Sequence, residues 1–227
     1  MPTLNVVREL GAALALMYVI HRCLRILPGN RSGLYPYVFF AQPTESAGAA
    51  IDVEILSPGS PHLSSLPREH QTLAQRFAAG DLCAAHIVKS EVRGYIWIAA
   101  GDYVEDEVDC RYVLTDDRLC WDYDVFVVPR YRLGRTFQRL WSATGGLLHL
   151  RGFTCSVSRI SRFNASSIRA HERMNAYRVG WATFVRAFGV QLTIRSTAPR
   201  VSISTSTEAC PHFKFSIPPY GGRVVGS

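Results

Sequence analysis

The chain has 227 residues, of which 48% are hydrophobic and 19% are charged. This length and this balance are typical of a folded protein built around one domain of ordinary size, and they exclude a disordered tail or a coiled coil. The formal net charge of +7 comes almost entirely from arginine. Such a charge favours an anionic ligand, although it does not separate a nucleic acid from a phosphorylated cofactor, and arginine usage can also reflect genome composition.

Residues 4–27 are predicted to form an amphipathic helix, because apolar side chains recur there at steps of three and four. The apolar run Leu10–Ile20 is shorter than the ~20 residues that cross a bilayer, and no signal-peptide cleavage site follows it. We therefore expect a cytoplasmic protein. Its helix is expected either to dock onto the domain or to make a peripheral contact with the inner face of a membrane.

The six cysteines are scattered, without a C-x-x-C pair or a Cys/His spacing that would assemble a zinc site. Four of them lie in apolar, strand-like surroundings, where cysteine usually acts as a small hydrophobic residue. We expect reduced thiols and no metal centre.

The rest of the chain reads as strands with few helices. Strand-like runs and antiparallel hairpins are predicted at 34–42, 51–56, 82–90 with 94–101, 111–115 with 121–128, 154–160, and 177–188 with 190–196. Helices are predicted at 69–77, at 134–150 and from a cap at Asn164 to about Met174. This order predicts an α+β fold in which helix 134–150 joins two parallel neighbouring strands. The expected divisions are 1–50, 51–196 and a loop-like tail over 197–227.

Two carboxylates stand inside the apolar strand 121–128. Because alternate residues of a strand share a face, Asp122 and Asp124 are expected on one face with Phe126 and Val128. Burial and like charge would raise the pKa of Asp124 toward neutrality, as a general base requires. Alternatively, arginines or backbone donors hold each aspartate. The acidic residues of 105–109 are a rival source of a base or an acidic lip, or a solvated loop.

A basic turn follows this strand and opens helix 134–150. Its arginines are Arg130, Arg132 and Arg135, which surround Gly134. Unpaired backbone N–H groups and the positive end of a helix dipole bind a pyrophosphate, and the arginines would add charge-assisted contacts. A solvated basic turn is the other interpretation.

Two segments carry a resemblance to the GNAT superfamily of acyl-CoA-dependent N-acyltransferases, over roughly residues 51–195. The segment V-V-P-R-Y-R-L-G-R-T-F from Val127 to Phe137 resembles the family's cofactor-binding turn, although it keeps only one of the glycines usual there. The segment N-A-S-S-I-R-A-H-E-R-M places Asn164 and His171 on positions of the family's second motif. The resemblance implies a mixed, mostly antiparallel central sheet with helices on both faces.

The resemblance also implies acetyl-CoA or another acyl-CoA as co-substrate and direct acyl transfer to a small-molecule or protein amine acceptor. Asp124 would deprotonate the amine, and His171 would protonate the leaving thiolate. The implied cofactor-binding residues are Phe126, Val127, Arg132, Leu133, Gly134, Arg135, Thr136, Phe137 and Asn164. The alternative is a non-catalytic acyl-CoA-binding or interaction module of the same fold. No nucleic-acid partner is expected, because no recognition motif is present and acidic segments interrupt the basic ones. The acceptor's identity and the oligomeric state stay open.

Overall fold

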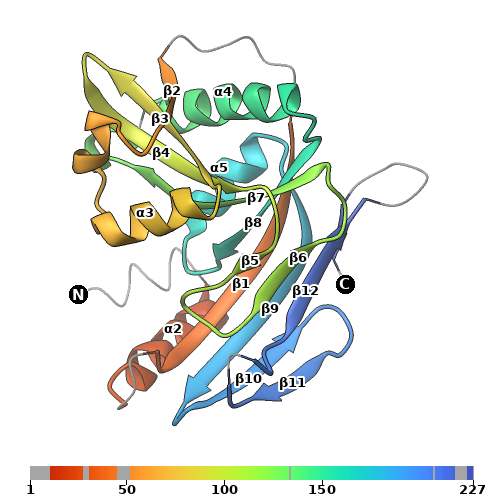
Figure 1. The fold of residues 1–227 in the computed structure, drawn as a ribbon. Helices are drawn as coiled ribbons and strands as arrows, with labels where there is room; N and C mark the ends of the chain where they lie inside the picture. The colour runs from red at the N-terminus through yellow and green to blue at the C-terminus, as the bar shows by residue number, and fades with distance from the viewer. Residues whose placement is uncertain are drawn as a thin grey trace. The chain divides into compact units, whose positions relative to one another are not determined.

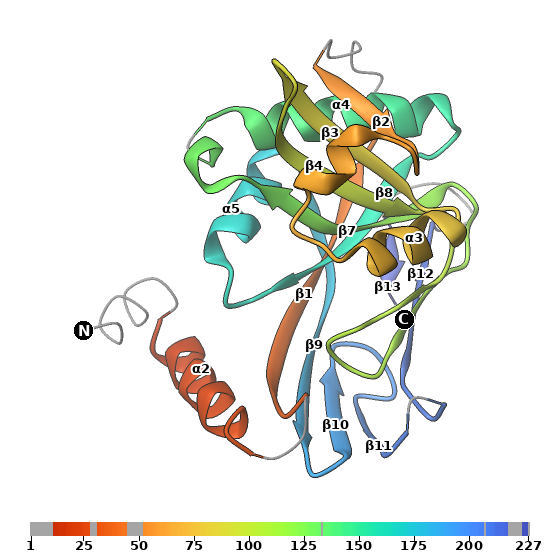
Figure 2. The same ribbon diagram turned by 60° about the vertical axis from the view of Figure 1, so that its left-hand side comes forward.

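A computed structural model describes residues 11–27, 31–44, 52–132, 134–206, 208–217 and 224–226 (Figures 1 and 2). The chain divides into two compact units. Unit 1 comprises Met1–Gln42, Asp102–Asp116 and Arg159–Ser227, and unit 2 comprises Pro43–Gly101 and Asp117–Ser158. The division expected at residues 50 and 196 stays a prediction.

Unit 2 carries the strand and the basic turn singled out in the sequence. Its elements are β2 (Val53–Leu56), the 3-10 turn η1 (Pro61–Ser65), α3 (His70–Ala78), β3 (Leu82–Val88), β4 (Glu91–Ala99), β7 (Leu119–Val127), the 3-10 turn η2 (Pro129–Tyr131), α4 (Thr136–Leu150) and the start of β8 (Cys155–Ser161). The strands lie in the order β2-β3-β4-β7-β8. All neighbours are antiparallel except β7 and β8, which pair in parallel.

The parallel pair β7–β8 is joined by α4, as the sequence predicts. A parallel connection needs a crossover of a dozen or more residues, which a helix supplies. The helix buries one face, with Leu140, Trp141, Thr144 and Leu148 all nearly inaccessible to solvent. The mixed, mostly antiparallel α+β fold expected from the sequence is therefore confirmed.

The described residues of unit 1 form two packed sheets and two helices. Its elements are α2 (Ala12–Leu24), β1 (Gly33–Pro43), β5 (Tyr103–Val104), β6 (Arg111–Leu114), α5 (Ala165–Arg173), β9 (Tyr177–Ala187), β10 (Val190–Arg195), β11 (Val201–Ser204), β12 (His212–Ser216) and β13 (Val225–Gly226). The first sheet has the order β11-β10-β9-β1, and the second has the order β13-β12-β6-β5. The expected antiparallel pair β9–β10 is confirmed.

Two expectations about unit 1 are wrong. Residues 111–115 do not form a hairpin with 121–128, because β6 pairs with β5 and, in parallel, with β12. The tail over 197–227 is not all loop, because β11, β12 and β13 lie there. The cause of both is long-range aromatic packing: the ring of Phe39 lies 5.6 Å from Tyr112 and 5.2 Å from Phe213, centroid to centroid. Local turn signals do not report such contacts.

The N-terminal helix docks on unit 1 by one side only. Tyr18 packs edge-on against Phe163 with ring centroids 5.4 Å apart, and Nδ1 of His21 lies 2.8 Å from the carbonyl oxygen of Leu34. Leu16 and Ile20, in contrast, are exposed. Residues 4–10 of the expected helix lie outside the described residues. No helix in the described part of the chain is long and apolar enough to span a membrane.

Candidate functional site

Strand β7 contains a bulge at Asp124. The pairs Trp97↔Tyr123 and Tyr95↔Phe126 leave two residues of β7 opposite one residue of β4. Asp124 itself has φ 48°, in the left-handed region. An extra residue in one strand shifts the alternation of side chains by one position. The expectation that Asp122 and Asp124 share a face, which rests on strict alternation, is therefore wrong.

Asp124 is held by two arginines, Arg68 just before α3 and Arg76 in the last turn of α3. Nε of Arg68 donates to Oδ2 at 2.7 Å, Nη2 of Arg68 contacts Oδ1, and Nη1 of Arg76 donates to Oδ2 at 2.5 Å. The Arg76 guanidinium also lies 4.9 Å from the ring centroid of Tyr123, so Asp124 lies on the Tyr123 side of the strand. Of the two interpretations open from the sequence, the arginine-held carboxylate is the one observed.

Two buried polar atoms lie on the same side as Asp124 and were not singled out in the sequence. Tyr95, whose ring stacks on Phe126, and Trp97, which lies under the Arg76 guanidinium at 5.1 Å, are both fully buried. The Tyr95 hydroxyl and the Trp97 Nε1 have no hydrogen-bond partner among the described residues. Burial raises the pKa of Tyr95, so its hydroxyl keeps its proton. In the sequence these residues look like core only, because nothing local shows which strand will face them.

Asp122 is the aspartate with the perturbed acidity. Its side chain is buried, and Oγ of Ser156 on β8 donates to Oδ2 at 2.7 Å. Burial raises its pKa from 3.8 to about 7, against the opposing effect of the Ser156 and Ser158 hydroxyls. Burial thus favours the protonated form of the Asp122 carboxyl, and no ion pair of this carboxyl is found within the described residues.

The backbone of Val127 faces away from β4. The N–H of Val128 donates to the carbonyl of Arg93 at 2.9 Å, so that pair is hydrogen-bonded across the two strands. Bonded and non-bonded pairs alternate in an antiparallel ladder, and so Val127 directs its N–H and C=O to the other edge of β7. Pairing with β8 covers only Leu119–Trp121 on that edge. The Val127 carbonyl accepts a hydrogen bond from Nε of Arg132 at 3.0 Å. The N–H of Val127 is directed outward from the same edge of β7, where β8 is no longer paired.

The three arginines of the basic turn have different partners. Arg130 forms an ion pair with Glu91, and Arg132 is held by the Val127 carbonyl. Arg135 is exposed, and no ion pair of its guanidinium is found within the described residues. It precedes α4 at a helix N-terminus that has no side-chain cap. The charge of Arg135 and the first N–H groups of α4 are thus available to an anion.

Gly134 is not required by the fold. A Cβ built there would meet only the carbonyl oxygen of Tyr131 at 3.5 Å, an ordinary contact, and its φ lies outside the left-handed region. Leu133 lies outside the described residues. Neither the backbone conformation nor the packing at position 134 requires a glycine, so a need for glycine there would come from the close approach of a ligand.

Gly94, in contrast, is required by close packing. A Cβ at Gly94 would lie 2.8 Å from the carbonyl oxygen of Phe126 and 3.4 Å from Thr136. This glycine lets the first turn of α4 approach β4, where Thr136 is buried and Phe137 half-buried. The predicted cofactor-binding residues 126, 127, 132 and 134–137 thus follow one another along one strand end, turn and helix start of unit 2.

The remaining predicted site residues, Asn164 and His171, belong to unit 1. Oδ1 of Asn164 accepts from the backbone N–H of Ser167 at 3.1 Å, which confirms its role as a helix cap. His171 is buried, and its Nδ1 lies 2.8 Å from the carbonyl oxygen of Ser167. Burial lowers the pKa of His171, so its ring is neutral near pH 7. A proton-donating role for His171 stays a prediction.

The acidic segment 105–109 forms ion pairs within unit 1. Glu105 is buried and accepts two hydrogen bonds from Arg159, at 2.6 and 2.7 Å. Asp109 pairs with Arg186 at 2.8 Å. Burial raises the pKa of Glu105 to about 7. Glu105 and Asp109 are thus buried in ion pairs rather than solvated, whereas the side chains of Asp106 and Glu107 in the same segment are 73% and 50% exposed.

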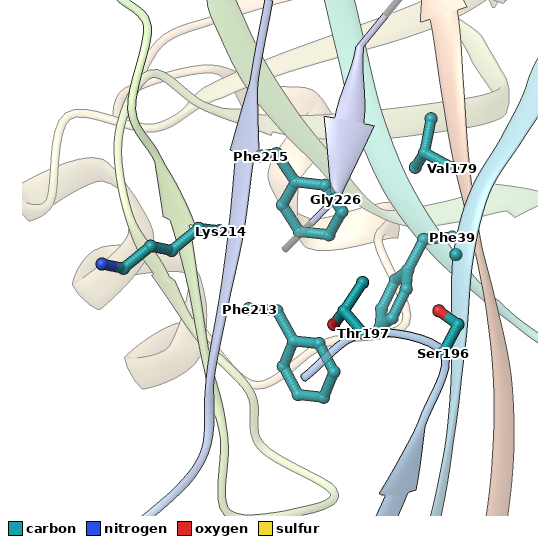
Figure 3. Close-up of a pocket in the computed structure, with 9 residues that line it drawn as sticks. Phe39, Val179, Ser196, Thr197, Phe213, Lys214, Phe215 and Gly226 are labelled. Atoms are coloured by element: carbon teal, nitrogen blue, oxygen red, sulfur yellow. The ribbon is translucent and has the colours of Figure 1, made fainter. Parts of the chain in front are cut away.

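Unit 1 also has a small cavity between its sheets (Figure 3). The rings of Phe39, Phe213 and Phe215 line it, and Lys214 stands at its side. Its volume is about 10 Å³, room for about one water molecule. It contains no predicted site residue and cannot hold a coenzyme.

Comparison with solved structures finds proteins with a similar fold at low sequence identity. No protein-family model matches the chain, and no curated protein matches it. A protein from Novosphingobium aromaticivorans described as a GNAT-family acetyltransferase is similar at 14% identity and a TM-score of 0.47, over 66% of this chain and 62% of that chain. The GCN5-related N-acetyltransferase of Sphaerobacter thermophilus is similar at 12% identity and a TM-score of 0.39, over 64% of this chain and 49% of that chain.

A tandem GNAT protein from the clavulanic acid biosynthesis pathway is similar at 12% identity and a TM-score of 0.42, over 67% of this chain and 53% of that chain. The chain thus matches less than two thirds of the length of each of these proteins. Identities and TM-scores this low describe a likeness in the outline of the fold and say nothing about the roles of individual residues.

The raised pKa of Asp122 predicts a pH-dependent stability. A carboxyl whose pKa is higher in the folded state stabilises the fold below pH 4 and loses that contribution as the pH rises through about 7. In Asp122→Asn this loss should be absent. At pH 8 the variant should therefore gain up to ~4 kcal/mol in free energy of unfolding relative to wild type, compared with their difference at pH 4. Urea unfolding of both proteins at the two pH values measures this, and parallel pH profiles would contradict it.

Proposed function

We propose that the chain is an N-acyltransferase that moves an acyl group from acyl-CoA to an amine by direct transfer. The single observation that carries the proposal is the edge of β7 beyond Trp121, where pairing with β8 has ended and the N–H of Val127 is directed outward. A fixed N–H donor on an open strand edge can polarise a thioester carbonyl and stabilise the oxyanion of a tetrahedral intermediate. The fold resemblance to acetyltransferases accords with this but does not name the acyl group.

The coenzyme's pyrophosphate would bind where β7 leads into α4. The first N–H groups of α4 are uncapped, Arg135 is unpaired among the described residues, and Gly134 permits close backbone approach. Arg130 and Arg132 are held by protein groups and would contribute less. This distribution of partners predicts which arginine matters most.

Asp124 would deprotonate the amine after the substrate's ammonium group has displaced one of its two arginines. Arg68 is the more exposed of its two partners, with 38% of the side chain accessible against 14% for Arg76. An ammonium group arriving from solvent carries the same charge as the Arg68 guanidinium and can replace it. Asp124 would then accept a proton from the ammonium, and the neutral amine would attack the thioester.

A non-catalytic acyl-CoA-binding module is the second candidate. The observation that favours it is that two arginines contact both oxygens of the Asp124 carboxylate, so that a substrate amine would have to compete with them. The two candidates agree on the coenzyme and differ on turnover.

Coenzyme binding is tested by thermal shift with coenzyme A and acyl-CoAs of increasing chain length. Ligand that binds the native state raises the melting temperature, and the acyl group that fits best should raise it most. Arg135→Ala should weaken binding about tenfold or more, because a charge-assisted contact is worth ~1.5–3 kcal/mol. The matched control Arg130→Ala removes the same charge from an arginine already paired with Glu91 and should change affinity less.

Gly134→Ala is a second test of the turn, because the fold tolerates a Cβ there. Its melting temperature without ligand should equal that of wild type, while its response to coenzyme A should be smaller. An absence of any shift with coenzyme A or its acyl esters in wild type would contradict both candidate functions. If all three variants showed the same rise in melting temperature with coenzyme A as wild type, the coenzyme would not bind at this turn.

Turnover is tested with Asp124→Asn and Arg68→Ala in an assay that detects free coenzyme A thiol. Loss of the base should lower kcat by at least about a hundredfold. Loss of Arg68 should leave kcat near that of wild type and lower KM for a cationic amine, because the competing guanidinium is gone. Circular dichroism checks that each variant folds. If wild type binds acyl-CoA but turns over none of a panel of amines, the non-catalytic candidate is the correct one.

A further inference from the structure

The outer strands of unit 1 present an exposed apolar face. The register places Ile194 opposite Val201 and Leu192 opposite Ile203, so these side chains share one face of the sheet. Ile203 is 69% exposed and Val201 is 58% exposed. The face continues onto β9, because Trp181 and Val185 share it through their pairing with β1 and β10. Trp181 is 41% exposed.

The opposite face of the same strands is the one that carries the core. Phe184 and Thr193 are fully buried there, and Gln191 exchanges hydrogen bonds with the backbone of Asp109 at 2.7 and 2.8 Å. The fold therefore already has its buried sheet face. A second, apolar but exposed face is not explained by the stability of unit 1, since apolar patches on isolated proteins are usually small.

The turn between β9 and β10 adds an independent observation. It consists of Phe188 and Gly189, with φ 54° and 77°. Both residues lie in the left-handed region, as a two-residue type I′ hairpin turn requires, and Asn-Gly is the preferred sequence there. Phe188 adopts this unfavourable conformation while 73% of it is exposed. Asparagine at position 188 would stabilise this turn better than phenylalanine. The phenylalanine side chain therefore indicates a role other than stabilising the turn.

The charges around this face are positive. Of the four arginines in residues 177–206, Arg186 and Arg195 lie on the opposite face, where Arg186 pairs with Asp109 and Arg195 is buried, while Arg178 and Arg200 are exposed. Arg178 lies on the exposed face itself, where it pairs with Glu172 of α5 at 2.8 Å. The exposed Arg169 and Arg173 of α5 and Arg200 of the β10–β11 turn supply the remaining positive charge. An apolar face with a basic border is complementary to an anionic lipid surface.

We propose that this face binds an anionic membrane surface, with the ring of Phe188 inserted at the level of the headgroups. We call it the β9–β11 face, and its residues are Trp181, Phe188, Val190, Ile194, Val201 and Ile203 (Figures 1 and 2 show β9, β10 and β11 side by side). A second copy of the chain fits less well, because a face-to-face contact would set arginine borders of equal sign against each other. The exposed tryptophan and phenylalanine are the residue types enriched at membrane interfaces.

The exposed side of α2 offers a second apolar surface in the same unit. Leu16, Val19, Ile20 and Ile26 are exposed, and Arg22 and Arg25 flank them. This is the segment for which the sequence left a peripheral membrane contact open as an alternative to docking on the domain. The experiment therefore has to separate it from the β9–β11 face.

The test is sedimentation of the full chain with vesicles of phosphatidylcholine alone or with about a quarter phosphatidylserine, at low and high salt. Wild type should bind the anionic vesicles, and salt should weaken the binding. Phe188→Asn should reduce vesicle affinity about tenfold or more while the melting temperature stays equal or rises, because Asn-Gly suits the turn. Ile203→Ser should reduce affinity in the same direction.

Two matched controls make the result specific. Val104→Ser removes a side chain of similar exposure, 49%, from the other sheet of unit 1 and should leave vesicle binding unchanged. Leu16→Ser tests α2. The proposal is overturned if wild type does not bind anionic vesicles, or if Leu16→Ser abolishes binding while Phe188→Asn and Ile203→Ser do not. It is also overturned if sedimentation equilibrium shows a dimer that Phe188→Asn dissociates, because the face would then bind a second copy.

Discussion

The geometry of the candidate site depends on the single extra residue in β7 at Asp124. Without the bulge, Asp124 would share the buried face of Asp122, and two carboxylates would lie together in a medium that strongly disfavours charge. With it, Asp124 turns to Arg68 and Arg76, whose positive charges compensate its own. Asp122 stays on the other side with a serine hydroxyl for a partner and a pKa near 7. One backbone irregularity thus separates two acids into different chemical environments.

The same strand shows how a sheet can leave a donor available. Beyond Trp121, β7 remains paired with β4 but not with β8, and the alternation of the ladder turns the Val127 N–H to the unpaired edge. Gly94 lets α4 begin close to this point, so the strand edge and the helix N-terminus both present N–H groups within unit 2. These are the groups that an acyl thioester and a pyrophosphate need. The site follows from backbone geometry more than from side-chain identity.

The sequence predicted those elements whose signals are local. The period of residues 134–150 predicted α4, the Asn164 cap predicted α5, and the parallel β7–β8 pair followed from the crossover between them. The sequence did not predict the bulge, because the alternation of side chains that indicates a strand does not show where one strand has an extra residue relative to its partner. Nor did it predict the second sheet of unit 1, since contacts such as Phe39 with Phe213 link positions far apart in the chain. The arginine partners of Asp124 were foreseen only as an alternative, because Arg68 and Arg76 reach it from an earlier segment.

The central claim is that an acyl-CoA binds along the edge of β7 and accepts a hydrogen bond from Val127. Amide hydrogen exchange, followed residue by residue with and without a non-hydrolysable acyl-CoA analogue, tests it most directly. The account predicts slower exchange at Val127 and in the first turn of α4 on addition of the analogue, with little change at the β4–β3 hairpin. Unchanged exchange at Val127, with protection elsewhere in the chain, would contradict it.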